Sequence, residues 1–96
     1  MNQIVVKDFE KLDVSIKKQI LKKLILLETT PFLGKPLGNR AGMDLIGYYK
    51  LYAYKRKIRI IYEIKDESLI IRVVSIGKRE DFTVYLQAFL RRGKNR

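Results

Sequence analysis

The chain has 96 residues, no cysteine and no histidine, and its 21 lysines and arginines outnumber 10 acidic residues, which gives a net charge of +11. The lack of cysteine excludes a disulfide scaffold and a thiol nucleophile, and the lack of histidine removes the commonest acid–base residue and metal ligand. This charge excess indicates a polyanionic partner, namely nucleic acid, an acidic protein or a membrane surface.

The length and the 47% apolar content predict one globular domain over residues 1–96. No apolar run approaches the ~20 residues that a membrane-spanning helix needs, and the N-terminus has no signal-peptide pattern. We therefore expect a cytoplasmic protein without a membrane partner.

The first residues permit two interpretations. Gln3–Val6 is short and β-branched, so we predict a short strand there and a single helical turn at Asp8–Leu12. A helix starting near Asn2 is the alternative, because an apolar stripe at helical spacing runs through this segment. The stripe consists of Val5, Phe9, Leu12, Ile16 and Ile20.

An amphipathic helix is predicted next. Asp13 and Ser15 are both N-cap candidates, and apolar residues keep helical spacing as far as Leu27, with lysines on the opposite side. Pro31 ends this helix near Thr29, because proline cannot continue an α-helix.

A loop and three strands are predicted in the middle of the chain. Residues 31–47 hold both prolines and four of the six glycines, which predicts a loop, although Met43–Ile46 either begin the next strand or form a turn. Strands are expected at about Gly47–Tyr54, Ile58–Ile64 and Leu69–Ile76. The turns between them are short and charged, which requires antiparallel neighbours.

Two-residue loops, with Tyr54 opposite Lys57 and Lys65 opposite Ser68, would divide the side chains of these strands into two faces. One face is almost wholly apolar and is predicted to lie under the helices. The other face is basic and phenolic, and it places Tyr52 directly opposite a cation on the next strand. Its members are Tyr48, Lys50, Tyr52, Tyr54, Arg59, Ile61, Glu63, Ile70, Arg72 and Val74.

The pattern becomes helical again after Gly77. Asp81 is an N-cap candidate, and apolar spacing predicts a last helix over about Phe82–Arg92. The basic residues Arg91, Arg92, Lys94 and Arg96 are interpreted as a solvated, frayed terminus. The predicted fold class is therefore α+β: a small antiparallel sheet of three to four strands, with N-terminal helices packed on one face and a C-terminal helix.

The cations and tyrosines of the second face are the candidate functional residues. Arginine binds phosphate through a planar fork, lysine binds it as a point charge, and tyrosine stacks on unpaired bases. The pattern fits RNA binding and fits an ordinary solvated sheet face equally well. The sequence contains no metal-ligand cluster and no glycine-rich phosphate loop, so we expect no metal and no cofactor. The candidates are Lys50, Tyr52, Tyr54, Arg59 and Arg72, followed by Lys78, Arg79 and Tyr85.

Two segments resemble RelE-type toxins. The strand Ile58–Ile64, IRIIYEI, is similar to one of their strands, and Val74–Glu80, VSIGKRE, followed by Val84 and Tyr85, resembles their strand–turn–helix signature. The segment Tyr49–Leu51 matches the preceding strand, and the likeness covers most of the chain. The Gly-Lys-Arg-Glu turn with a tyrosine six residues after its arginine is fairly specific. The Arg-x-x-Tyr strand is shared with the gyrase-poisoning ParE branch.

The resemblance implies a RelE-like toxin of a type II toxin–antitoxin system: a ribosome-dependent endoribonuclease that cleaves messenger RNA. In that chemistry a ribose 2′-OH attacks the adjacent phosphate and leaves a 2′,3′-cyclic phosphate and a 5′-OH. The implied partners are a cognate RelB-like antitoxin, the ribosome and messenger RNA, with operator DNA bound only through the antitoxin complex. The alternatives are a ParE-like gyrase inhibitor and a catalytically weakened toxin that acts through antitoxin or DNA binding.

The resemblance also assigns catalytic residues, namely Lys50, Arg59, Arg79 and Tyr85. Lys50 would help to activate the 2′-OH or stabilise charge, the two arginines would hold the phosphate and its transition state, and Tyr85 would stack on or orient the substrate. The family's second lysine is replaced by Tyr52, which can donate a proton but brings no positive charge. The further candidates for catalysis or substrate contact are Tyr52, Tyr54, Arg72 and Lys78.

Overall fold

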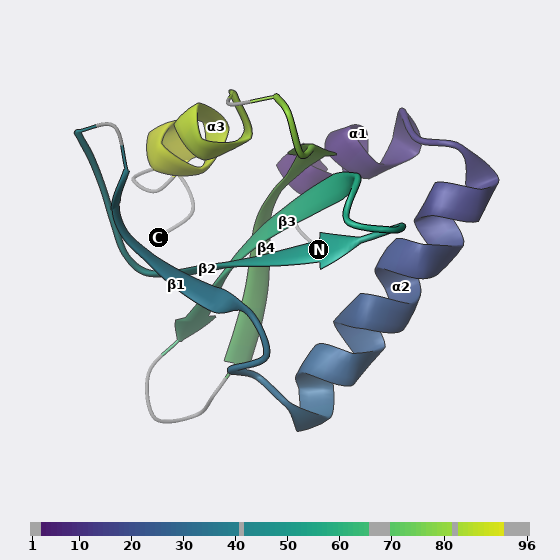
Figure 1. The fold of residues 1–96 in the computed structure, drawn as a ribbon, viewed down its shortest axis with the longest axis horizontal. Coiled ribbons are helices and arrows are strands. Elements are labelled where there is room, and N and C mark those ends of the chain that lie inside the picture. Colours follow the sequence, from purple (N-terminus) through teal and green to yellow (C-terminus); the bar gives the residue numbers. More distant parts are fainter. Residues whose placement is uncertain (1–2, 41, 66–69, 82, 92–96) are drawn as a thin grey trace.

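The structure is a computed structural model and describes residues 3–40, 42–65, 70–81 and 83–91. Its elements follow in the order α1 (Gln3–Glu10), α2 (Val14–Thr29), β1 (Lys35–Arg40), β2 (Met43–Ala53), β3 (Ile58–Lys65), β4 (Ile70–Lys78) and α3 (Thr83–Arg91). The strands form one antiparallel sheet in the order β1-β2-β3-β4, with α2 and α3 on opposite sides of it (Figure 1). The predicted α+β class is confirmed, and no helix in these ranges is long and apolar enough to cross a membrane.

The N-terminal segment is helical, so the strand predicted at Gln3–Val6 is wrong and the alternative helix is correct. Tertiary packing outweighs the β propensity of these residues, because the helix places Phe9 against the core. The helix also covers β4, an edge strand: the Asp8 carboxylate accepts a hydrogen bond of 3.2 Å from the Ile76 N–H.

Helix α2 ends at Thr29, as predicted. Asp13 occupies its N-cap position, although the Asp13 side chain makes no capping hydrogen bond. In α3, by contrast, the predicted cap is formed: the Asp81 carboxylate accepts hydrogen bonds from the Thr83 N–H (3.0 Å) and hydroxyl (2.6 Å). These bonds lower the pKa of Asp81. Phe82 and Arg92, the predicted ends of this helix, lie outside the described residues.

Residues 31–47 were predicted to form a loop, but Lys35–Arg40 form strand β1, so the prediction is wrong for this segment. A strand with a proline is tolerated because β1 is an edge strand, and its pairing with β2 shifts between Pro36 and Gly38. Leu37 fixes its face, since this side chain is buried. The other interpretation of Met43–Ile46, as the start of the next strand, is correct.

The segment between α2 and β1 is held by one phenol. The Tyr62 hydroxyl donates to the Pro31 carbonyl and accepts from the Gly34 N–H, each at 2.8 Å. A Cβ at Gly34 would lie 2.5 Å from the Lys50 carbonyl oxygen and 2.7 Å from the Tyr62 hydroxyl. Glycine is therefore required for β1 to run close beside this part of β2.

The register of the first hairpin is as predicted, with Tyr52 opposite Arg59, but the strands end at Ala53 and begin again at Ile58, so the predicted two-residue loop is wrong. In the second hairpin Lys65 pairs with Ile70, so its predicted pairing with Ser68, a residue outside the described ranges, is wrong. A further shift of register between Ile61 and Tyr62 moves the later residues of β4 by one position. The predicted apolar face of the sheet lies under α1 and α2, where it packs against Ile20 and Leu27 of α2 and gains Ile76. Its predicted members in the described ranges are Tyr49, Leu51, Ala53, Ile58, Ile60, Tyr62, Ile64, Ile71 and Val73, whereas Leu69 lies outside those ranges.

The second face of the sheet is not open along its whole length, because α3 covers part of it. Tyr48, Ile61 and Val74 pack there with Val84 and Tyr85 of the helix. The approach is close: a Cβ on Gly77 would collide with the Val84 side chain. Among the described residues, the part of this face near the β2–β3 hairpin lies outside that cluster and borders a cavity.

Arg91 connects α3 to α1 and to β4, so its interpretation as part of a frayed tail is wrong. Its guanidinium donates to the two Asp8 carboxylate oxygens at 2.7 and 3.2 Å and to the Val74 carbonyl at 2.8 Å. The first and last helices are thereby joined across the edge of β4. The other three residues assigned to that tail, Arg92, Lys94 and Arg96, lie outside the described ranges.

Candidate functional site

Four cations surround the ring of Tyr52. They come from β2, from the turn after it, from β3 and from the turn after β4, which the fold brings together at one end of the sheet. The distances to the Tyr52 ring centroid are 5.7 Å for Lys50 Nζ, 5.1 Å for Arg56 Cζ, 5.6 Å for Arg59 Cζ and 5.5 Å for Arg79 Cζ. We call these five residues the Tyr52 cluster.

Arg59 is the most buried cation of the Tyr52 cluster, with 8% of its surface exposed. Its guanidinium lies 4.5 Å from the Tyr85 ring centroid, and its Nη2 donates a long hydrogen bond of 3.5 Å to the Tyr52 hydroxyl. Its Nε is buried without a hydrogen-bond partner, and no carboxylate within the described residues forms an ion pair with it. Burying a cation without a counter-charge is costly, so an anionic ligand would stabilise this site.

The cations change the acidity of the phenol at their centre. The pKa of Tyr52 falls from its ordinary value of 10.0 to about 8. The hydrogen bond from Arg59 is the main cause, and the charges of Lys50 and Arg59 lower the pKa further, while partial burial opposes them. At pH 7 roughly a tenth of the protein molecules therefore carry Tyr52 as a phenolate.

An unusual turn places Arg56 over Tyr52. Tyr54, Lys55 and Arg56 adopt φ angles of +51°, +55° and +65°, in the left-handed region that disfavours residues other than glycine. The turn is held by hydrogen bonds from the Lys57 N–H to the Tyr54 carbonyl (3.0 Å) and from the Arg79 N–H to the Lys57 carbonyl (2.8 Å). The second bond fixes the two turns of the cluster to each other.

Tyr54 leaves the strand at this turn, so its predicted place beside Tyr52 is wrong. Its ring packs against the apolar core under the N-terminal helices, on the other side of the sheet. The alternation of side chains assumed an extended backbone at Tyr54, and its left-handed φ ends that alternation.

Two of the other candidates lie outside the Tyr52 cluster. Arg72 forms an ion pair with Glu63, its cross-strand neighbour on β3, which satisfies its charge locally. Lys78 is exposed at the end of β4 and lines a cavity of about 570 Å³ beside Arg56 and Arg79.

Tyr85, which the resemblance assigns to the substrate, is 1% exposed and packs in the core under α3. Its ring faces the Arg59 guanidinium. Arg59 therefore links the buried Tyr85 to the Tyr52 cluster.

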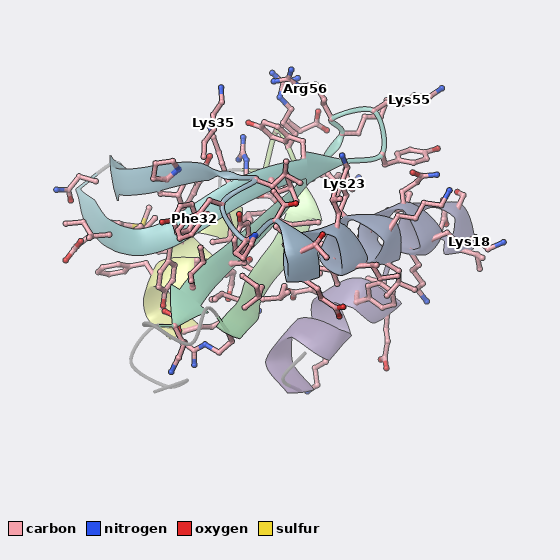
Figure 2. All side chains as sticks on the ribbon, turned by 90° about the horizontal axis from the view of Figure 1, so that it is seen from below. Lys18, Lys23, Phe32, Lys35, Lys55 and Arg56 are labelled. Atoms are coloured by element: carbon pink, nitrogen blue, oxygen red, sulfur yellow. The ribbon has the colours of Figure 1, made fainter. Side chains whose placement is uncertain are left out.

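Sequence reasoning missed Lys35 and Arg56. Both line a cavity of about 260 Å³ together with Lys50 and Tyr52, and their side chains rise on the side of the sheet away from α2 (Figure 2). Lys35 was assigned to a loop, whereas it pairs directly with Lys50 across β1 and β2. Like charges in direct cross-strand contact are destabilising, so this cavity also favours an anion. The basic run Lys55-Arg56-Lys57 can be recognised in the sequence, but the turn geometry that directs Arg56 toward Tyr52 cannot.

The chain is similar to known toxins along most of its length. A family model described as the ParE toxin of the type II toxin–antitoxin system parDE matches residues 2–81. A RelE-like toxin protein of Escherichia coli is 37% identical over 79 residues, which span 82% of this chain and 79% of that protein. The mRNA interferase toxin RelE of Escherichia coli K12 is 31% identical over 85 residues, 88% of this chain and 85% of that protein.

Solved structures agree with these similarities. A free arginine-to-alanine double mutant of the E. coli toxin RelE has a TM-score of 0.73 at 28% identity, covering 95% of this chain and 92% of that one. The same mutant toxin bound to a peptide of the antitoxin RelB has a TM-score of 0.65 at 27% identity, covering 91% and 87%.

The fold and the family match define a toxin of a type II toxin–antitoxin system. More closely, the chain belongs to the RelE/ParE superfamily and is a RelE-like toxin.

Proposed function

We propose that this protein is a messenger RNA interferase, an endoribonuclease that cleaves messenger RNA on the ribosome. The main support is Arg59, a buried guanidinium without a carboxylate partner in the described ranges, beside a phenol that three further cations surround. A phosphodiester of RNA would supply the missing negative charge. The name of the E. coli K12 relative, mRNA interferase toxin, supports the same activity.

The proposed reaction is attack of a ribose 2′-oxygen on the adjacent phosphorus, with departure of the 5′-oxygen. Arg59 and Arg79 would hold the non-bridging phosphate oxygens and stabilise the extra negative charge of the transition state. Lys50 would add a third positive charge beside them. Tyr85 would act as a positioning residue, because its buried ring faces the Arg59 guanidinium at 4.5 Å and keeps it at the site.

An antitoxin is the proposed protein partner. The support is a structural relative, the E. coli toxin RelE, which has been captured with a peptide of the antitoxin RelB. A net charge of +11 suits an acidic antitoxin segment. The chain would act as a single cytoplasmic domain and would reach operator DNA only through that complex.

The test is cleavage of a defined messenger RNA on programmed ribosomes, with cut sites mapped by primer extension. We expect new 5′ ends within translated codons and 2′,3′-cyclic phosphates on the upstream fragments. The Arg79→Ala variant should cut about 100-fold more slowly, because it loses one transition-state contact. Lys22→Ala, which removes an exposed lysine of α2 remote from the cluster, is the matched control. Intact messenger RNA with folded wild-type protein and active ribosomes would refute the proposal.

Gyrase inhibition is the second candidate function, because the matching family model is described as a ParE toxin. This function needs protein contacts but no phosphate chemistry. Purified protein in a DNA supercoiling assay distinguishes the two: inhibition of supercoiling with intact messenger RNA would favour the ParE-like function. A protein inactive in both assays would be the weakened toxin that the loss of the family's second lysine suggests.

A further inference from the structure

The Tyr52 side chain lies among the positive charges of the cluster. It is the acceptor of the hydrogen bond from Arg59 Nη2, and the same ring is approached by Lys50, Arg56 and Arg79. A lysine ammonium at this position would add a fifth cation to four. A phenolate would instead be the one anion at their centre, so these surroundings favour the ionised form of the tyrosine.

Every neighbouring element contributes positive charge to Tyr52. Lys50 lies on β2, Arg59 on β3, and Arg56 and Arg79 in the two turns, while Lys35 of β1 lines the same cavity. Among the described residues that line the cavities on both sides of Arg56, the only carboxylate is Glu80, which is exposed and follows Arg79. One phosphate charge would leave the cluster net positive, so the phenolate stays favoured with RNA bound.

We infer that Tyr52 is a catalytic residue, the base that removes the proton from the attacking 2′-OH. The inference rests on the proposed function and deepens it, because it assigns the proton transfer to the residue that stands where the family has a lysine. The hydrogen bond from Arg59 links that base to the guanidinium proposed to hold the phosphate. Base and phosphate would thus be brought together by one side chain.

The proposed step is balanced as follows. The phenolate oxygen of Tyr52 takes the 2′-OH proton, the 2′-oxygen forms its bond to phosphorus, and the bond from phosphorus to the 5′-oxygen breaks. The departing 5′-oxygen takes a proton from water, and the resulting hydroxide removes the proton from the Tyr52 phenol. The products are a 2′,3′-cyclic phosphate and a 5′-OH, and the phenolate is restored.

The test is the pH dependence of single-turnover cleavage. With a pKa of about 8 for Tyr52, the wild-type rate should rise tenfold per pH unit below pH 8 and level off above it. Tyr52→Phe keeps the ring but removes the base, so the plateau rate should fall about 100-fold and the rising limb should disappear. Tyr49→Phe is the matched control, since Tyr49 lies on the same strand but stacks on Tyr62 under the helices.

Replacing Tyr52 alone with a fluorinated tyrosine of lower phenol pKa gives a second readout. The rising limb should move to lower pH by the amount that fluorination lowers the phenol pKa, which a purely structural role would not produce. The role of Tyr52 would be overturned, with the proposed function left standing, by either of two results. One is a Tyr52→Phe variant with the wild-type cleavage rate and pH dependence, and the other is a rising limb of the pH–rate profile that fluorination does not move.

The ionisation of Tyr52 is also measured without any RNA. Phenolate absorbance of the wild-type protein minus that of Tyr52→Phe should titrate near pH 8. A difference that titrates near pH 10 would overturn the inference even if the protein cleaves RNA. Wild-type protein that titrates near pH 8 but leaves ribosome-bound messenger RNA intact at every pH would refute the proposed function, and with it the role of Tyr52 in cleavage.

Discussion

Arg59 and Arg91 are both largely buried, yet their surroundings are opposite. Arg91 donates to both oxygens of Asp8 and to a backbone carbonyl, so its charge and its donors are satisfied inside the protein. Arg59 is in contact with a tyrosine hydroxyl and two tyrosine rings, and its Nε has no partner within the described part of the chain. One guanidinium is satisfied within the fold, and the other is the one that we propose binds the phosphate.

The difference follows from where the two arginines lie. Arg91 joins α3 to α1 across the edge of β4, where removal of either partner would leave a largely buried charge without its counter-charge. Arg59 lies opposite Tyr52 in the sheet, at the end where two cationic turns meet. Repulsion among the cations there opposes folding, and an incoming phosphate would relieve it. Stability and activity are therefore assigned to different arginines.

The largest expected effect is on cleavage. Arg59→Met keeps the volume of the side chain but removes the charge, and we expect the rate of messenger RNA cleavage to fall by about 100- to 1,000-fold. The free energy of unfolding should stay the same or rise by up to about 1 kcal/mol, because a buried cation without a partner has been replaced by an apolar side chain. Chemical denaturation measures this, and a clear loss of stability would mean that Arg59 is structural.

The same substitution at the other arginine should have the reverse result. Arg91→Met leaves the Asp8 carboxylate, 16% exposed, without its cation, so the free energy of unfolding should fall by about 2–3 kcal/mol. Cleavage at a temperature where the variant is folded should be close to that of wild type. The double variant Asp8→Asn with Arg91→Met should recover part of the lost stability; no recovery would mean that the ion pair is not the cause.

The periodic parts of the fold were predictable, because β2, β3 and the apolar stripe of α2 follow simple spacing rules. The pairing of Tyr52 with Arg59 followed from a two-residue hairpin loop and proved correct. Residues whose environment depends on distant contacts were not predictable. β-Branched residues at Gln3–Val6 indicated a strand, but they begin helix α1, which packs against β4. Proline and glycine at 36 and 38 indicated a loop, yet they lie in an edge strand.

The Tyr52 cluster was predicted only in part for the same physical reason. Lys50, Arg59 and Arg79 were named from the sequence, and the fold brings all three to Tyr52. Arg56 was not named, because its direction is set by left-handed backbone angles that no periodic pattern encodes. The burial of Tyr85 depends on how closely α3 approaches the sheet at Gly77.

The smallest expected effect concerns the turn that carries Arg56. Glycine adopts φ near +65° without steric cost, so Arg56→Gly should raise the free energy of unfolding by about 0.5 kcal/mol. The same change removes a cation from the Tyr52 cluster, so binding of a short RNA at low salt should weaken about fivefold, with a smaller salt dependence. Stability and RNA affinity would thus change in opposite directions, as we expect of stability and cleavage rate in Arg59→Met.

Lys55→Gly separates the two contributions of this turn. Lys55 has a similar φ of +55°, but its exposed side chain points away from Arg56 at the tip of the hairpin (Figure 2). It should therefore gain the same stability and lose less RNA affinity than Arg56→Gly, measured by fluorescence anisotropy under identical conditions. Equal loss of affinity in both variants would mean that the turn contributes only general positive charge. If Lys55→Gly loses less affinity than Arg56→Gly, the steric cost of the left-handed turn is explained by the position that the turn gives to the Arg56 guanidinium over Tyr52.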